Sequence, residues 1–499
     1  MSILNNSFRN PVIPGFNPDP TIEMRTVEPG AGSWASTLRY RPQEKRWYLA
    51  TGVFQRYRPG SDERIFPRGF YVYTDNIWDD AAWSEPIYFD NPGFDQDLFW
   101  DHDDKVYLST TVRLANRRPD SKLKDFGIHI SEIELETGRT LTPPQLIPEG
   151  GTEAGHQEWV FRSREGVYGP WEAQGKPLWY NGPEEEVQRT GHADIFDDGK
   201  GNWWAVFRMY IPGVLIAAFV GVRPVKDDTG RYLEPQMGRE TFLVKVDWVD
   251  DWPVFNEGLN ITLNTPSRMP IQQDITLVKP GDVKWQADLT RTDLEMGWYQ
   301  KNTPLKRFYS FTERPGYLRL YGNCYDLSSP EAPAMLLRKQ SSYAETFQVK
   351  LQFNPRKQSY EAGIVLWWSQ FSYATCGLTL HERLGEQTLT VVSRTPTGKA
   401  GEMAFHYLDL KTPYNEDEVR RILPGDTIQL RIEAKPTEYK LSCGLGGHES
   451  SFCVDAKDLA VMPPVGGAFC GTMFGIYAFG RWEPVLDAAD FFDLNIRAT

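Results

Sequence analysis

The 499-residue sequence has no excess of basic residues, no long apolar run and few cysteines, and each of these features argues against a class of protein. Its 54 Lys and Arg are outnumbered by 67 Asp and Glu, which gives a net charge of −13 at pH 7. Because nucleic acids and anionic membrane surfaces are bound through clustered Lys and Arg, this balance argues against both as partners. No apolar run approaches the roughly 18 residues of a membrane-spanning helix, so no transmembrane segment is expected.

Cysteine is also scarce, with five residues at Cys324, Cys376, Cys443, Cys453 and Cys470. They are odd in number and lack Cys-x-x-Cys spacing, which argues against a structural metal site. We expect buried free thiols, and a single disulfide such as Cys443–Cys453 is the alternative. The first ten residues contain no apolar segment typical of a secretory signal. We therefore expect a cytoplasmic protein, or an exported one if the natural start lies upstream of this sequence.

What the sequence does contain is turn residues and aromatic side chains, with 42 Gly, 36 Pro and 13% aromatics. Short strand-like segments separated by polar turns follow one another over residues 30–260, without a convincing amphipathic helix. This weak repetition is more typical of propeller blades than of a sandwich. An irregular linker is predicted around residues 260–283, and the alternating strands beyond it favour a two-sheet sandwich.

One turn combines stiffness with an acidic side chain. Asp19 stands between Pro18 and Pro20, and each proline fixes its own φ and restricts the residue before it. A carboxylate on a stiff backbone suits general-base catalysis, which is sensitive to small displacements. The alternative is an ordinary turn in which Asp19 accepts backbone hydrogen bonds.

Three later segments favour the catalytic interpretation. They are residues 93–99 (Gly-Phe-Asp-Gln-Asp-Leu-Phe), 190–194 (Thr-Gly-His-Ala-Asp) and 237–243 (Met-Gly-Arg-Glu-Thr-Phe-Leu). With the Asp19 turn they resemble glycoside hydrolase family 43, which contains β-xylosidases and α-L-arabinofuranosidases. Residues 303–320 and 336–340 are similar to the C-terminal β-sandwich of its β-xylosidase members. The resemblance implies an all-β fold, with a five-bladed β-propeller over 1–262, incomplete in this chain, and a concanavalin-like β-sandwich over 283–499.

The resemblance also implies inverting hydrolysis of glycosidic bonds. One carboxylate activates water and one carboxylic acid protonates the leaving oxygen, about 6.5–9.5 Å away. Asp19 matches the general base, and Asp95 matches a third carboxylate whose negative charge raises the pKa of the acid. Arg239 matches an arginine that contacts the sugar, and its alternative is a structural salt bridge with a neighbour such as Glu240. Phe16 is the aromatic candidate for substrate contact in the Asp19 turn.

His192 matches a histidine that lies on the propeller axis, near a bound cation that is often calcium and usually reached through water. His192 is therefore a candidate for substrate contact and for a water-mediated metal, and its alternative is a core histidine. No cofactor is expected to be required, apart from this structural calcium. The acidic run at residues 101–104 fits an exposed hairpin turn better than a metal site. Asp97 is interpreted as structural.

The sequence departs from the family pattern where the general acid is expected. That Glu should lie on a strand between Ile133 and the segment 149–156, but Leu146-Ile147-Pro148 runs directly into Glu149. Glu149 is the nearest candidate acid by position, although it matches a later motif. Most of a first blade is also missing after residue 22, and residues 208–219 form an apolar insertion.

These departures suggest mis-spliced exons or a faulty gene prediction. A propeller with exposed blade edges is prone to aggregation, so we expect this polypeptide to fold poorly or to have little activity.

Three functions therefore compete. The first is hydrolysis of xylan-derived or arabinose-bearing oligosaccharides from the non-reducing end, by a β-xylosidase or α-L-arabinofuranosidase. The second is an inactive relative, or defective gene product, that retains only carbohydrate binding. The third, a structural propeller without sugar chemistry, is disfavoured by the ordered Asp19, Asp95, His192 and Arg239. The sequence leaves the oligomeric state open.

Overall fold

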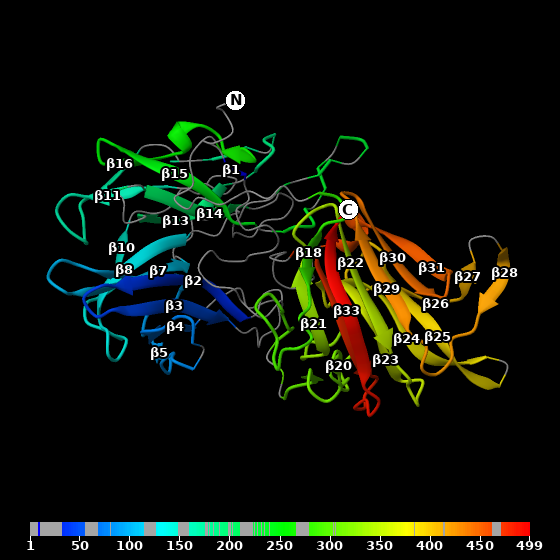
Figure 1. The fold of residues 1–499 in the computed structure, drawn as a ribbon. Helices are drawn as coiled ribbons and strands as arrows, with labels where there is room; N and C mark the ends of the chain where they lie inside the picture. Colours follow the sequence, from blue (N-terminus) through cyan, green and yellow to red (C-terminus); the bar gives the residue numbers. More distant parts are fainter. Residues whose placement is uncertain are drawn as a thin grey trace.

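The computed structural model describes residues 8–9, 32–54, 68–79, 81–113, 126–147, 159–174, 178, 180–182, 184–188, 190–197, 201, 203–209, 223, 225–226, 228–230, 232–233, 235–238, 240–265, 279–302, 304, 306–383, 385–412, 415–461 and 471–499. Strands dominate these residues, and their helices are the single turns α1 (Ala456–Leu459) and η1 (Asn256–Gly258). Neither is long enough to cross a membrane. Figure 1 shows two lobes, the first containing β1 to β17 and the second β18 to β33.

The first lobe consists of small antiparallel sheets. Its strands are β1 (Phe8–Arg9), β2 (Gly32–Arg41), β3 (Arg46–Phe54), β4 (Arg68–Thr74), β5 (Ile87–Tyr88), β6 (Phe94–Trp100), β7 (Val106–Arg113), β8 (Phe126–Glu134), β9 (Arg139–Thr140), β10 (Gln145–Ile147), β11 (Phe161–Ser163), β12 (Trp171–Ala173), β13 (Thr190–Asp197), β14 (Trp203–Met209), β15 (Phe242–Val249), β16 (Trp252–Phe255) and β17 (Asn264–Thr265). They form the sheets β2-β3-β4-β5, β6-β7-β8-β10 with β9, β11-β12, β13-β14-β15-β16 and β1-β17.

This arrangement of five small sheets fits the predicted propeller. The β1-β17 pair places Phe8 opposite Thr265, so the start of the chain lies beside the end of the lobe. Among the described residues this pair and β11-β12 have two strands each. In the sequence, these two small sheets lie near the two segments where we expect family strands to be missing, and those segments are outside the described residues.

The hairpins of this lobe follow from turn chemistry. Residues 101–104 join β6 to β7, and the amide of Asp101 donates to the carbonyl of Lys105 at 2.9 Å. Asp104 adopts a left-handed φ of 62°, which Asp tolerates at turns. His102 is 89% exposed. The predicted exposed hairpin turn is therefore confirmed.

The second lobe is a sandwich of two antiparallel sheets. One contains ten strands: β18 (Val283–Gln286), β19 (Tyr309–Ser310), β20 (Leu318–Leu320), β22 (Glu345–Gln352), β27 (Leu410–Thr412), β28 (Asn415–Arg420), β29 (Ile428–Ala434), β30 (Glu438–Leu445), β31 (His448–Asp455) and β33 (Ala489–Ala498). The other contains six: β21 (Ala334–Lys339), β23 (Tyr360–Ser369), β24 (Ser372–Arg383), β25 (Glu386–Pro396), β26 (Met403–Leu408) and β32 (Met473–Gly480). The prediction of an all-β chain with a C-terminal sandwich is confirmed.

The core of the sandwich lies between its sheets. Phe347 of the ten-stranded sheet stacks on Phe474 of the six-stranded sheet, with ring centroids 6.0 Å apart. Alternate residues of the six-stranded sheet, such as Val365 and Trp367, belong to a second apolar cluster on its opposite face. Tyr299 belongs to this second cluster. Strands β23 and β32 are consequently buried along their whole length.

The four described cysteines are free thiols, as expected, but burial was predicted correctly only for Cys376 and Cys443, since Cys324 is partly exposed and Cys453 is exposed. Contact with Cys376, together with burial, raises the pKa of Cys443 well above its ordinary value. Cys443 lies opposite Ser450 and Cys453 opposite Lys440, so the two cysteines are offset along the β30-β31 ladder. This offset explains why the alternative Cys443–Cys453 disulfide does not form. Cys470 lies outside the described residues.

Candidate active site

The first strands of three blades share one irregularity. The pairing of β2 shifts register between Trp34 and Thr37, and that of β6 shifts between Phe94 and Asp97. Strand β13 shifts in the same way between Gly191 and Asp194. Each strand is the edge of its sheet, and β-bulges at such positions re-aim the side chains that they carry.

Asp95 and His192 occupy equivalent places within two of these bulges. Their φ angles are 54° and 58°, in the left-handed region where Asp and His are tolerated better than most side chains. Gly93, just before the first bulge, has a φ of 140°, and a Cβ there would lie 2.7 Å from the carbonyl oxygen of Thr111. The local sequences therefore suit bulges that present Asp95 and His192.

An ion-pair network ties the three bulged strands together. Arg39 Nη1 donates to both carboxylate oxygens of Asp194, each at 3.0 Å, and Arg39 Nη2 donates to Asp97 Oδ2 at 2.8 Å. Since one guanidinium on β2 reaches carboxylates on β6 and β13, the three strands converge at this point. Asp95 and His192 each stand two residues before one of these carboxylates, so both belong to the region of convergence.

The network shifts the pKa values of Arg39 and Asp97. Although 37% of the Asp97 side chain is exposed, its Oδ1 is enclosed and has no hydrogen-bond partner among the described residues. Burial raises the pKa of Asp97, and Arg39 opposes this effect. Burial disfavours the Arg39 cation, but the two carboxylates together raise its pKa above the ordinary value. Asp97 thus joins blades through Arg39, which accords with the structural role expected for it.

A second buried ion pair lies where the lobes meet. Arg223 Nε and Nη2 donate to the two oxygens of the fully buried Glu240, at 2.7 and 2.8 Å. From the sandwich, the Tyr343 hydroxyl donates to the carbonyl of Arg223 at 2.5 Å. Burial, with the negative charge of Glu240, raises the pKa of Tyr343 well above its ordinary value.

The backbone near Arg239 is also anchored to the sandwich. The amide of Thr472 donates to the carbonyl of Gln236 at 2.7 Å. Gln236 precedes Arg239 by three residues and is bonded directly to the second lobe. Glu240 follows Arg239 and is connected to that lobe through Arg223.

Four predicted site residues, Asp19, Phe16, Glu149 and Arg239, lie outside the described residues. Their roles stay predictions. The alternative role of Arg239, a salt bridge to Glu240, also stays a prediction, although Arg223 already binds both oxygens of that carboxylate.

Sequence reasoning missed Arg39, Asp194 and Arg223 as parts of this region. Two motifs did carry a signal: an aspartate follows two residues after Asp95 and two residues after His192. Nothing in the spacing of Arg39 or Arg223 identifies the carboxylates that they bind, because the partners lie 58 and 155 residues from Arg39 and 17 residues from Arg223.

The described residues do not fit a calcium ion held by protein ligands. Calcium takes about six to eight oxygen ligands, and no group of three or more His, Cys, Asp or Glu side chains is placed to share an ion in the described part of the chain. The carboxylates of Asp97 and Asp194 bind Arg39 instead. A water-mediated calcium at His192 stays a prediction.

Comparison with family models finds one match in each lobe. Residues 145–253 match the model described as Glycosyl hydrolases family 43, and residues 287–496 match the Beta xylosidase C-terminal Concanavalin A-like domain. A non-reducing end α-L-arabinofuranosidase of Bacteroides ovatus is 25% identical, over 98% of this chain and 95% of its own length. A xylan 1,3-β-xylosidase of a Vibrio species is 24% identical, over 89% of this chain and 90% of its own.

Solved structures agree on the fold. The crystal structure of a xylan β-1,4-xylosidase from Bacillus halodurans has a TM-score of 0.77 at 20% identity, and the match covers 98% of this chain and 99% of that one. At this identity the likeness shows the fold alone. Together with the two family models, it confirms the resemblance found in the motifs. The chain belongs to glycoside hydrolase family 43 and carries a β-xylosidase-type concanavalin-like C-terminal domain.

Proposed function

We propose that this chain is an inverting glycoside hydrolase that removes terminal β-D-xylosyl or α-L-arabinofuranosyl residues from xylan-derived oligosaccharides. The observation that carries the proposal is membership of family 43, with a xylosidase and an arabinofuranosidase among relatives that match 89% and 98% of the chain. The β-xylosidase-type C-terminal domain favours the xyloside.

In the proposed mechanism, Asp19 accepts a proton from a water molecule as the water attacks the anomeric carbon. A carboxylic acid on the opposite side, for which Glu149 is the candidate, donates its proton to the leaving glycosidic oxygen. The bond between the anomeric carbon and that oxygen breaks, and the configuration inverts. Asp95 holds negative charge near the acid, which raises the pKa of the acid and keeps it protonated near neutral pH.

The described geometry supports two parts of this proposal. The β6 bulge holds Asp95 at the convergence of three blades, where a propeller can place several side chains around one substrate. The anchored segments on both sides of Arg239 suit a residue that must keep a fixed position against a sugar.

The test is hydrolysis of p-nitrophenyl β-D-xylopyranoside and p-nitrophenyl α-L-arabinofuranoside by the purified chain. NMR of the first-formed sugar identifies its anomer, and inversion is expected. Asp19→Asn should lower kcat by a factor of about 10² to 10⁴, as expected for loss of a general base. Retention of configuration, or full activity of the Asp19→Asn variant, would contradict the proposal.

A second candidate is carbohydrate binding without hydrolysis. It is favoured by the missing acid-bearing strand, because an inverting enzyme without its acid cannot protonate the leaving group. Under this alternative neither nitrophenyl glycoside is hydrolysed, whereas calorimetry still detects binding of xylobiose. Glu149→Gln adds a further test, since the variant loses activity only if Glu149 is the acid.

A further inference from the structure

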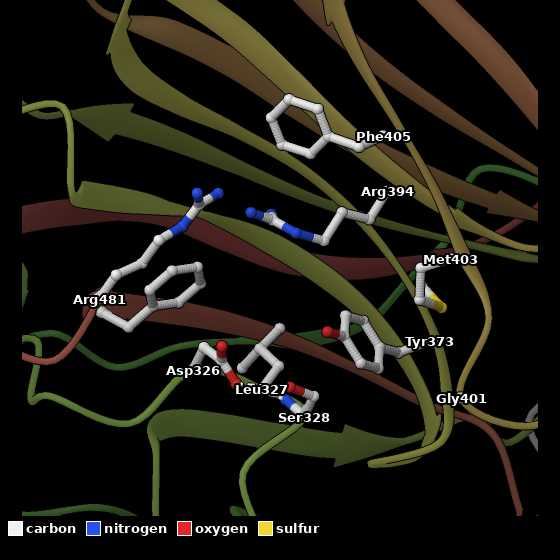
Figure 2. A pocket seen from close by; sticks show the side chains of 10 residues that line it. Asp326, Leu327, Ser328, Tyr373, Arg394, Gly401, Met403, Phe405 and Arg481 are labelled. Atoms are coloured by element: carbon white, nitrogen blue, oxygen red, sulfur yellow. Dashed lines mark hydrogen bonds between the residues drawn. The ribbon is translucent and has the colours of Figure 1, made fainter.

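The sandwich contains a cavity of about 280 Å³, far from the bulged strands in sequence. Figure 2 shows the side chains that line it, which are Asp326, Leu327, Ser328, Tyr373, Arg394, Gly401, Met403, Phe405, Phe479 and Arg481. Its volume is slightly below the usual range for small-molecule sites, about 300–1,000 Å³. The cavity is therefore suited to one small ligand rather than to a long chain.

The cavity lies on the face of the six-stranded sheet that points away from the ten-stranded sheet. Val391 of β25 packs in the core between the sheets, and Arg394, three residues later, projects from the other side. Tyr373 and Phe479 belong to the second apolar cluster, on this same outer face. Strands β24, β25, β26 and β32 and three loop segments thus supply the walls.

The Arg394 guanidinium lines the cavity, and two hydrogen bonds to one carboxylate hold it in place. Arg394 Nη2 donates to Glu361 Oε2 at 2.8 Å, and Nη1 donates to the other oxygen of the same carboxylate. The Tyr477 hydroxyl also donates to Glu361, at 2.7 Å. Because Glu361 and Tyr477 are buried, the Arg394 guanidinium is held in one orientation.

Arg481 adds a second cation that has no ion-pair partner among the described residues. Figure 2 shows the guanidinium groups of Arg394 and Arg481 pointing toward one another across the cavity. The carboxylate of Asp326 lies on another wall, where Oδ1 accepts from the amide and hydroxyl of Ser328, at 3.0 and 2.7 Å. Arg394 is already paired with Glu361, whereas the Arg481 guanidinium keeps its donors for a further anion.

An aromatic ring stands beside both cations. Phe405 is 40% exposed, and its ring centroid lies 5.1 Å from the Arg394 guanidinium carbon and 6.0 Å from that of Arg481. An exposed ring suits the apolar C–H face of a sugar, while Ser328, Tyr373 and Asp326 offer polar groups for hydroxyls.

We propose that this cavity is a non-catalytic site for a sugar that carries a carboxylate, a uronic acid. Its carboxylate binds between Arg394 and Arg481, and its ring packs on Phe405. The source of the ligand rests on the proposed function, since xylan-derived oligosaccharides with an acidic side sugar would present this group. The site would hold an acidic substituent of a substrate on the sandwich, apart from the bond that is cleaved.

The test is calorimetric binding to the full chain with four probes: xylotriose bearing a glucuronic acid side group, unsubstituted xylotriose, free D-glucuronate and sodium acetate. We expect the acidic oligosaccharide and D-glucuronate to bind, and acetate not to bind. Arg481→Gln and Phe405→Ala should each weaken binding of the acidic oligosaccharide about 10- to 100-fold. Trp482→Ala is the matched control, because Trp482 is next to Arg481, is 90% exposed and does not line the cavity.

Equal affinity for acidic and neutral xylotriose would overturn the proposal, as would an Arg481→Gln variant that binds like the wild type. Binding of acetate as tight as that of D-glucuronate would mean a general anion site and would also overturn it. Hydrolysis of the nitrophenyl glycosides by the wild-type chain, measured in parallel, decides the proposed function separately. If the chain binds the acidic sugar through Arg481 but hydrolyses neither glycoside, the proposed site is supported and the proposed activity is contradicted.

Discussion

Arg39 Nη1 lies 3.0 Å from both carboxylate oxygens of Asp194, a residue 155 positions further along the chain. The same side chain also holds Asp97, so one guanidinium joins the first strands of three blades. In a propeller each blade packs only on its neighbours, and a link of this kind fixes the blades around a common point.

Replacing Arg39 should therefore destabilise the first lobe. Arg39→Gln leaves the carboxylates of Asp97 and Asp194 without their shared cation, and we expect a loss of about 2 kcal/mol, between the values for exposed and buried pairs. Urea unfolding followed by tryptophan fluorescence measures the loss. In the double variant Arg39→Gln/Asp194→Asn the two effects should be less than additive, and strict additivity would contradict the link.

The Arg223–Glu240 ion pair of the first lobe should matter more than the Arg39 network, because its carboxylate is fully buried. Glu240→Gln leaves the Arg223 guanidinium with a neutral partner at a fully buried position, and we expect a loss of about 3 kcal/mol in the free energy of unfolding. Glu402→Gln is the control, since the Lys399–Glu402 pair is exposed and should change stability by about 0.5 kcal/mol or less. Equal losses in the free energy of unfolding for Glu240→Gln and Glu402→Gln would contradict the expected contribution of the buried pair.

Substitutions at Asp95 can distinguish the effect of backbone strain on stability from the effect of the carboxylate charge on catalysis. Asp95→Ala should destabilise the chain by about 1 kcal/mol more than Asp95→Asn, because alanine tolerates a φ of 54° less well than asparagine. Under the proposed function both variants lose the negative charge, so both should lower kcat and the apparent pKa of the general acid. Urea unfolding and the pH profile of kcat measure the two effects. His192→Ala and His192→Asn should reproduce the difference in stability, and equal stability of Ala and Asn at both positions would argue against backbone strain.

Alkaline pH should weaken the sandwich through Tyr373. Burial, the main cause, raises the pKa of Tyr373 to about 12. In the unfolded chain a tyrosine titrates near about 10, so between these values the unfolded state binds fewer protons and stability falls as pH rises. Below pH about 10 both states keep the proton, and no dependence on this group is expected.

The matched variant for this prediction is Tyr373→Phe. Its stability should decline less steeply than that of the wild type, by about 2 kcal/mol at pH 12. Urea unfolding from pH 9 to 12, with tyrosinate absorbance recorded in parallel, measures the difference. Parallel curves for the two proteins would contradict the expected shift.

Much of the fold could be predicted from the sequence. Short alternating segments and polar turns are local signals, and they were enough to predict small antiparallel sheets followed by a sandwich. The hairpin turn at residues 101–104 was predicted in the same way, because Asp residues in a short polar run favour turns. The motifs around Asp95 and His192 identified the family before any contact was known.

The contacts at the centre of the molecule were not predictable in this way. Arg39 has no local feature that distinguishes it from Arg41 on the same strand or from Arg46 on the next one, yet it alone of the three binds both Asp97 and Asp194. Likewise, the sequence placed Arg239 beside Glu240, whereas the tertiary structure gives Glu240 the distant Arg223 as a bidentate partner.

By itself the sequence determined the family, the all-β fold and the identity of the candidate catalytic side chains, because these depend on residue type and local spacing. Tertiary structure alone decided which charges meet: the Arg39 network, the Arg223–Glu240 pair at the lobe interface and the facing Arg394 and Arg481 in the sandwich. The physical reason is that a β-rich fold brings together strands far apart in sequence, and Coulomb energies depend on distance and burial rather than on sequence order.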